Sequence, residues 1–284
     1  MSGRRVHEDL RPGKPIRPSE GLRVAYRRRL TDLVDAMEKS VVYWLSAEWK
    51  RQQGKITAYD ASPAVALTQA LRKRMARWKR RFGESSSPWG HWFADQAEKS
   101  ASAAVGASIA GVTGITVRWQ ATRAMNNAVQ SIVAENVALI KSLPEKLAPE
   151  LEGIIMRSVR SGRDLSGVVE DLHKRFEVAR HRAAFIAEDQ TNKASEALSR
   201  VRMQEMGIDR AEWVHVTRSI DARATHKNMD GRSFYLSEGM FDPGAGRRIQ
   251  PGELPRCRCT KRPLIPAFVK SQRDLQLYEE ADFA

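Results

Sequence analysis

The sequence predicts a mainly α-helical protein, in which a long-helix N-terminal body is followed by a small α+β C-terminal module. Two observations predict this fold class. Apolar residues recur at three- and four-residue steps through most of the first 208 residues. After Gly207 the chain changes to an alternating, β-branched segment and then to a stretch rich in glycine and proline. We therefore expect an extended basic arm over residues 1–18, a helical body over 19–208, and an α+β module with a C-terminal tail over 209–284.

The helical body is expected to contain several helices separated by loops. The first is predicted from Ser19, a favourable N-cap residue, to about Gln53, with Gly54 after its end. The sequence GESSSP at 83–88, the glycines at 111 and 114, and Pro144 predict breaks. The later helices are accordingly predicted over residues 63–82, 89–110, 116–142, 145–160, 164–176 and 179–206.

The terminal module is expected to contain two strands and many turns. The sequence AEWVHV at 211–216 alternates between apolar and polar residues and predicts one strand, and residues 257–264 predict a second. Between Asp230 and Pro255 lie five glycines and three prolines, with DG and PG turn signals. The residues between the two strands are therefore predicted to be mostly turns.

Composition and charge exclude several classes of protein. With 42% hydrophobic residues in 284, the chain can bury a core and is not expected to be disordered. Two cysteines are too few for a secreted disulfide framework, and the first residues carry no apolar signal-peptide segment. The net charge is +14, and residues 1–100 hold 21 Lys and Arg against 11 Asp and Glu. This surplus indicates a polyanion or an acidic protein surface as partner.

One basic segment, residues 71–82 (LRKRMARWKRRF), is the candidate polyanion site. Along a helix its cations cover most of the circumference and leave a narrow apolar stripe. Such cations contact phosphates without base specificity and in a salt-dependent manner. Docking on an acidic protein and a simply solvated face are the alternatives. The candidate DNA-binding or polyanion-binding residues are Arg72, Lys73, Arg74, Arg77, Lys79, Arg80 and Arg81.

The uncharged run at residues 100–117 has two interpretations. Its length is close to the ~20 residues that cross a bilayer, but it contains no Leu or Phe and is rich in small residues. Close helix packing through those small residues is the favoured interpretation, and a membrane-active segment is the alternative. No stable membrane span is expected.

His226, Cys257 and Cys259 are candidate metal ligands, because an imidazole and two thiols that meet in space suit zinc. Asp221, His215 and Asp230 are candidates for a fourth ligand, with Asp221 the first choice. A strained disulfide and two buried reduced cysteines beside a histidine are the alternatives. We find no catalytic motif, so no catalytic residue and no enzyme activity are predicted.

The terminal module resembles the phage Mu F-like minor head proteins. The resemblance rests on Trp213, the motif Asp221-x-Arg223-x-x-His226, the Asp230-Gly231 turn, and the segment PGELPRCRC at 251–259. The stretch RAAFIAEDQ at 182–190 also fits the family pattern. Within this pattern we assign structural roles to Trp213, Asp221, Arg223, Asp230 and Gly231.

The resemblance, which covers about residues 135–266, implies a structural minor head protein of a tailed double-stranded DNA phage or prophage. Such a protein acts in head morphogenesis and supports capsid assembly and DNA packaging or ejection. Its implied partners are the portal protein, capsid or scaffold proteins, and packaged DNA. Its implied location is the capsid interior or portal vertex, and the host cytoplasm during assembly. A metal-dependent nuclease or hydrolase that uses Asp221, His226 and the cysteines, and a membrane-active ejection protein, are the alternatives.

Overall fold

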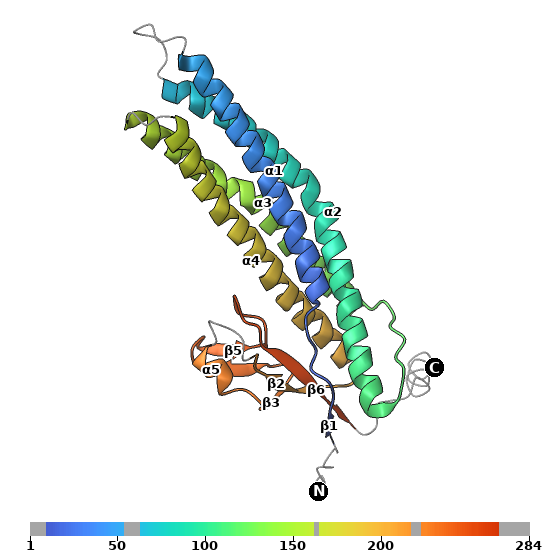
Figure 1. Cartoon of the computed structure of the whole chain (residues 1–284). Helices are drawn as coiled ribbons and strands as arrows, with labels where there is room; N and C mark the ends of the chain where they lie inside the picture. The colour runs from blue at the N-terminus through green and yellow to red at the C-terminus, as the bar shows by residue number, and fades with distance from the viewer. Residues whose placement is uncertain (1–9, 54–62, 162–164, 217–222, 267–284) are drawn as a thin grey trace, which may run out of the picture. The chain divides into compact units, whose positions relative to one another are not determined.

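The structure, a computed structural model, describes residues 10–53, 63–161, 165–216 and 223–266 (Figure 1). Long helices dominate it and a small sheet-containing region follows them, as the sequence predicts. The helices are α1 (Glu20–Gln53), α2 (Pro63–Thr113), α3 (Arg123–Arg160), α4 (Leu165–Glu205) and the short α5 (Ala224–Lys227). The strands are β1 (Leu10–Pro12), β2 (Arg210–Val214), β3 (Ser233–Tyr235), β4 (Met240–Asp242), β5 (Arg247–Ile249) and β6 (Thr260–Pro266).

The chain folds into two compact units. The helical unit contains residues 21–93 and 132–188, and the sheet unit contains residues 1–20, 94–131 and 189–284. Helices α2, α3 and α4 each contribute residues to both units. The arm, body and module expected from the sequence remain a prediction about domain organisation, since these units group the residues differently.

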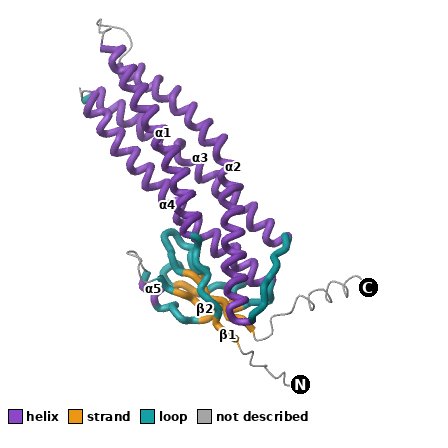
Figure 2. The backbone as a smooth tube through the Cα atoms, turned by 45° about the vertical axis from the view of Figure 1, so that its right-hand side comes forward, coloured by secondary structure: helices purple, strands orange, loops and turns teal. Residues whose placement is uncertain are grey.

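In the helical unit the four long helices lie side by side and bury one stripe each (Figure 2). Tyr26 of α1 is fully buried, donates a hydrogen bond of 2.8 Å to the Asn136 side chain of α3, and lies with its ring centroid 4.5 Å from that of Phe93. Burial raises the pKa of Tyr26. The Asn136 amide in turn donates to the Ile132 carbonyl oxygen at 2.8 Å. The polar side chains of Tyr26 and Asn136 are thus paired, as buried polar groups usually are.

The predicted breaks at 83–88 and at Pro144 are wrong, because α2 and α3 continue through them. A proline inside a helix costs about 3 kcal/mol, but here it does not interrupt the buried stripe. Phe82 and Phe93 are both buried on either side of the GESSSP sequence, and Leu143 and Leu147 are buried around Pro144. Ser86 also donates a hydrogen bond of 2.7 Å to the Gly83 carbonyl oxygen within the helix. Tertiary burial therefore overrides the local loop signal.

Two further predicted helix boundaries differ from the structure. The predicted gap between 176 and 179 is absent, since α4 is continuous there and buries Phe176 and Ala179. The helix predicted from residue 116 begins instead at Arg123. Thr122 sets this start as an N-cap, because its hydroxyl oxygen accepts a hydrogen bond of 3.1 Å from the Met125 amide.

The sheet unit is built on an antiparallel sheet of strand order β1-β6-β2-β3, with β4 and β5 forming a separate hairpin. The two predicted strands correspond to β2 and β6, which pair over Ala211–Val214 and Thr260–Pro263. The described end of the expected arm is also a strand, because β1 pairs with β6 from Leu10↔Pro266 to Pro12↔Leu264. The sheet thus joins a strand near the start of the described chain to one near its end.

The uncharged run at 100–117 packs inside the sheet unit. Val105 and Ile109 of α2 are fully buried in the cluster that also contains Trp213 and Ile265. Gly106 lies against the Trp119 ring, and the small residues Ser102 and Ser108 of the run are themselves buried. This agrees with the interpretation as close helix packing. Among the described residues, no helix combines the length and apolar character that a membrane crossing requires.

Candidate metal centre

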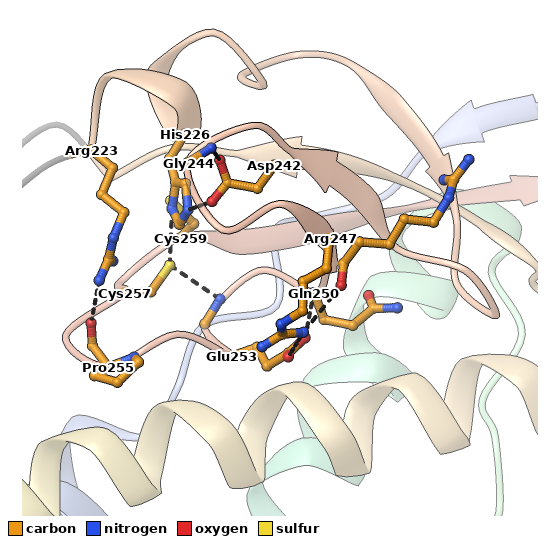
Figure 3. Close-up of polar contacts among 12 residues, drawn as sticks. Arg223, His226, Asp242, Gly244, Arg247, Gln250, Glu253, Pro255, Cys257 and Cys259 are labelled. Carbon is orange, nitrogen blue, oxygen red and sulfur yellow. Dashed lines mark hydrogen bonds and ion pairs between the residues drawn. The ribbon is translucent and has the colours of Figure 1, made fainter.

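His226, Cys257 and Cys259 meet in the sheet unit (Figure 3). His226 lies on α5, and the two cysteines lie in the loop that precedes β6. Their candidate ligand atoms all lie within 4.8 Å of one another, and all three side chains are buried. Both cysteines are free thiols. The structure therefore brings together the three residues that the sequence nominates, although they are about thirty residues apart.

The two ring nitrogens of His226 face different partners. Nδ1 lies 3.4 Å from Cys257 Sγ and 3.7 Å from Cys259 Sγ. Nε2 lies 3.2 Å from the Asp242 carboxylate. A carboxylate is an acceptor, so it holds the proton on Nε2 and leaves the Nδ1 lone pair directed at the thiols.

Asp242 is itself firmly placed. It is fully buried on β4, and its other carboxylate oxygen accepts a hydrogen bond of 2.9 Å from the Gly244 amide. Burial raises the pKa of Asp242, but the hydrogen bonds from Thr225, Gly244 and His226 outweigh burial and lower it below its ordinary value. The ionised carboxylate is thus the stable form, as a histidine-orienting group requires.

The cysteine loop is shaped around the two sulfur atoms. The Gly252 amide donates to Cys257 Sγ at 3.4 Å, and the Asn192 side chain of α4 donates to the Cys257 carbonyl oxygen at 3.2 Å. Gly252 has φ of +85°, and a Cβ there would meet the Cys259 carbonyl oxygen at 3.4 Å, so glycine suits this position. The hydrogen bond between the thiols lowers the pKa of Cys257 and raises that of Cys259.

His215 is the fourth residue at this cluster. Its Nδ1 lies 3.5 Å from Cys259 Sγ. The register explains the approach: Val214 pairs with Thr260, so the next position along each strand places His215 opposite Cys259. The backbone amide of His215 donates a hydrogen bond of 2.8 Å to the Asp230 carboxylate. This carboxylate therefore stabilises the local backbone. Asp221, the first choice for a fourth ligand, lies outside the described residues.

The remaining family-motif residues hold the surroundings of the cluster. The ring of Trp213, which is fully buried, packs edge-on against His226 at 5.4 Å between centroids. Arg223 donates a hydrogen bond of 3.0 Å to the Pro255 carbonyl oxygen. Gly231, with φ of +72°, donates its amide to the Trp213 carbonyl oxygen at 2.9 Å. These contacts fix the turns that carry the histidine and the cysteines.

This arrangement can bind a soft or borderline cation. Its donors are two thiols and two imidazoles, the set that favours zinc among the common metals. Three of the four side chains are buried, and His215 is half-buried. A closed site of this kind is typical of structural metal centres, whereas catalytic centres keep a position open to substrate.

The predicted basic segment lies on α2 in the helical unit, and its cations differ in how they are engaged. Arg72 pairs with Glu152 at 2.9 Å, and Arg74 stacks over the Trp44 ring at 4.2 Å. Arg81 lies 5.2 Å from the Trp78 ring centroid. Within the described parts of the chain, four cations have no ion-pair or ring partner: Lys73, Arg77, Lys79 and Arg80.

Two buried ion networks of the sheet unit were not predicted from the sequence. Lys261 of β6 is almost fully buried and pairs with Glu196 of α4 at 2.9 Å. Arg202 of α4 is also buried and pairs with Glu98 at 2.6 Å and Glu205 at 2.8 Å. The sequence did offer one signal for the first network: Lys261 lies at an inward-facing position of a predicted strand. A charge that is buried there requires a partner of opposite charge.

The fold and the site define a class of protein: long helices combined with a small β module that contains a buried cluster of cysteine and histidine. The sequence model of the phage Mu protein F-like family matches residues 150–262, so this part of the chain is similar to that family. The match runs from the end of α3 into β6 and includes all four residues of the cluster.

The chain is also similar to a protein of Haemophilus influenzae that is described as an uncharacterized protein. The two are 27% identical over 261 aligned residues, and the match covers 89% of this chain. The chain spans 55% of the length of that relative. No solved structure matches the chain.

Proposed function

We propose that this protein is a structural minor head protein of a tailed double-stranded DNA phage or prophage, located at the portal vertex or capsid interior. The observation that carries the proposal is the family match over 150–262, which includes α4, strands β2 to β5 and the cluster. In this proposal the protein binds the portal protein and packaged DNA, contacts capsid or scaffold proteins, supports packaging or ejection, and carries no catalytic activity.

Non-specific DNA contact is supported by one face of α2. Lys73, Arg77 and Arg80 are spaced at i, i+4 and i+7, so they share a face of the helix, and all three are exposed. They are also among the cations without a partner in the described residues. Free, aligned cations are available to neutralise phosphates, whereas paired ones would first have to leave their carboxylates.

Replacing Lys73, Arg77 and Arg80 with Gln is expected to weaken DNA binding mainly at low salt. Each lost phosphate contact lowers the slope of log K against log salt by about 0.9, so the three together lower it by up to about 2.7. The measurement is a salt titration of full-length protein on fluorescent duplex DNA.

The matched control replaces three exposed cations elsewhere in the helical unit, Arg27, Lys39 and Lys146, with Gln. Both variants lose the same charge, so only a localised site separates them. Equal slopes for the two variants would show that the face on α2 is not a DNA site. Supercoiled plasmid incubated with divalent metals reports on the nuclease alternative: nicking that His226→Ala abolishes would contradict a purely structural role.

A portal contact is supported by exposed apolar side chains in the helical unit. Tyr43 and Trp44 lie in the C-terminal half of α1, and Met156 lies near the end of α3. Val65 lies at the start of α2, and Val178 in the first half of α4. The corresponding helix ends gather at one end of the helical unit in Figure 1. Exposed apolar side chains on the outer faces of helices are available for contact with a protein partner.

The substitutions Tyr43→Ser and Met156→Gln together are expected to weaken binding to the portal protein of the same phage by at least about tenfold, since exposed aromatic anchors dominate interfaces. Co-purification and titration with full-length protein measure this. Tyr235→Ser with Phe241→Ser, which removes two exposed aromatic rings from the sheet unit, is the control. A loss of portal binding in the control alone would place the contact on the sheet unit instead.

A further inference from the structure

We propose that His215, His226, Cys257 and Cys259 bind one zinc ion, which acts as a structural centre of the sheet unit. The proposal goes beyond the head-protein function and does not depend on it. Three independent features of the described residues support it: the spacing of the donor atoms, the charge and orientation of the groups, and the position of the ligands in the fold.

The spacing of the donor atoms fits a tetrahedral zinc ion. Zinc lies about 2.3 Å from a thiolate sulfur and about 2.0–2.1 Å from an imidazole nitrogen, so neighbouring sulfur and nitrogen ligands lie about 3.6 Å apart. The His226 Nδ1 atom lies 3.4 Å from Cys257 Sγ and 3.7 Å from Cys259 Sγ. The His215 Nδ1 atom lies 3.5 Å from Cys259 Sγ. The donor atoms of His226, Cys257 and Cys259 all lie within 4.8 Å of one another, and His215, whose contact is with Cys259, would turn toward the other donors to complete the set.

The charges and orientations fit as well. Two thiolates and two neutral imidazoles balance the charge of Zn²⁺, so the loaded site carries no net charge into a buried position. Asp242 accepts from His226 Nε2, the arrangement by which a carboxylate fixes the tautomer of a zinc-ligating histidine. The Gly252 amide donates to Cys257 Sγ, which stabilises a thiolate there.

The ligands come from three separate places in the sheet unit. His215 follows β2, His226 lies on α5, and the cysteines precede β6. The intervening strands β3, β4 and β5 have three residues each. Segments this short bury little apolar surface to offset the entropy of closing their turns. One ion bound by ligands from all three segments would hold these turns together and so offset the entropy that their closure costs.

The first measurement is the zinc content of full-length protein purified without a His tag from zinc-supplemented cells. We expect about one zinc per chain, and none in the Cys257→Ser/Cys259→Ser variant. Cobalt(II) substitution gives a second readout, since two thiolates on a tetrahedral ion produce thiolate-to-metal charge-transfer absorption. Protein that contains no zinc and shows no such absorption with cobalt would overturn the proposal.

The ligand role of His215 is tested separately, with variants that retain both thiols. His215→Ala is expected to lower zinc affinity by more than 100-fold in competition with a chelator, and Asp242→Asn by about 10- to 100-fold, the range for groups that orient a ligand. His91→Ala, which removes an exposed histidine from α2, is the control and keeps the parent affinity. Equal affinities for His215→Ala and His91→Ala would overturn the assignment of His215.

Discussion

Replacing Glu196 with Gln is expected to lower the free energy of unfolding by about 3–5 kcal/mol, the cost of leaving one partner of a buried ion pair uncompensated. The Lys261 ammonium is almost fully buried and reaches both the Glu196 carboxylate at 2.9 Å and the Glu196 carbonyl oxygen at 2.7 Å. Burial lowers the pKa of Lys261, and the Glu196 carboxylate acts in the opposite direction. Chemical denaturation with an unchanged m-value measures the loss.

Two further variants separate the buried charge from a general effect on α4. Adding Lys261→Met to Glu196→Gln is expected to recover most of the lost stability, because no unpaired charge then remains inside. Glu170→Gln breaks the pair with Lys174 on the same helix, where both side chains are about two-thirds exposed, and should change stability little. A double variant no more stable than Glu196→Gln would contradict the explanation.

Replacing Arg202 with Met is expected to cost a similar amount, about 3–5 kcal/mol. Its guanidinium is 4% exposed and pairs with Glu98 and Glu205. It also donates to the Ser102 hydroxyl at 2.9 Å and the Gln120 carbonyl oxygen at 2.9 Å. Removing it leaves two carboxylates close together without a cation, and leaves the Gln120 carbonyl without this donor.

The geometry of Arg202 gives a graded test. Arg202→Lys keeps the charge but loses the planar fork, so its stability should lie between those of the parent and Arg202→Met. Arg51→Met, which removes an exposed arginine from its bidentate pair with Glu48 on α1, is the control and should have a smaller effect. If Arg202→Lys is as stable as the parent, the positive charge alone accounts for the role of Arg202.

The long helices and several of their ends, such as Gln53 of α1, could be predicted from the sequence, but their continuity through internal prolines and glycines could not. Apolar spacing identified buried stripes, including the one that contains Phe82. The prolines and glycines between the stripes were interpreted as breaks because local propensity was the only available criterion. Packing across the helical unit outweighs that propensity at Pro88, Pro144 and Pro149, and no property of the local sequence reports it.

The cysteine and histidine ligands of the candidate metal centre could be predicted from the sequence, but the residues that hold these ligands in place could not. Histidine and two cysteines in a turn-rich module were sufficient to nominate His226, Cys257 and Cys259. Asp242 and Asn192 were missed, because an aspartate after a phenylalanine and an asparagine in a helix carry no distinguishing pattern. Choosing His215 among the possible fourth ligands required the β2–β6 register, which is a property of the folded sheet.

The pairing of β1 with β6 has a consequence for folding during synthesis. A ribosome adds about 5–20 residues per second, so Leu10 waits roughly 10 to 50 s for its partner Pro266. All residues of the helical unit have been made well before then. That unit is therefore expected to fold first, while β1 and the apolar face around Val105 stay without the strands that bury them. A nascent chain released before β6 is complete would carry a finished helical unit and an exposed sheet edge, the kind of species that aggregates or needs a chaperone.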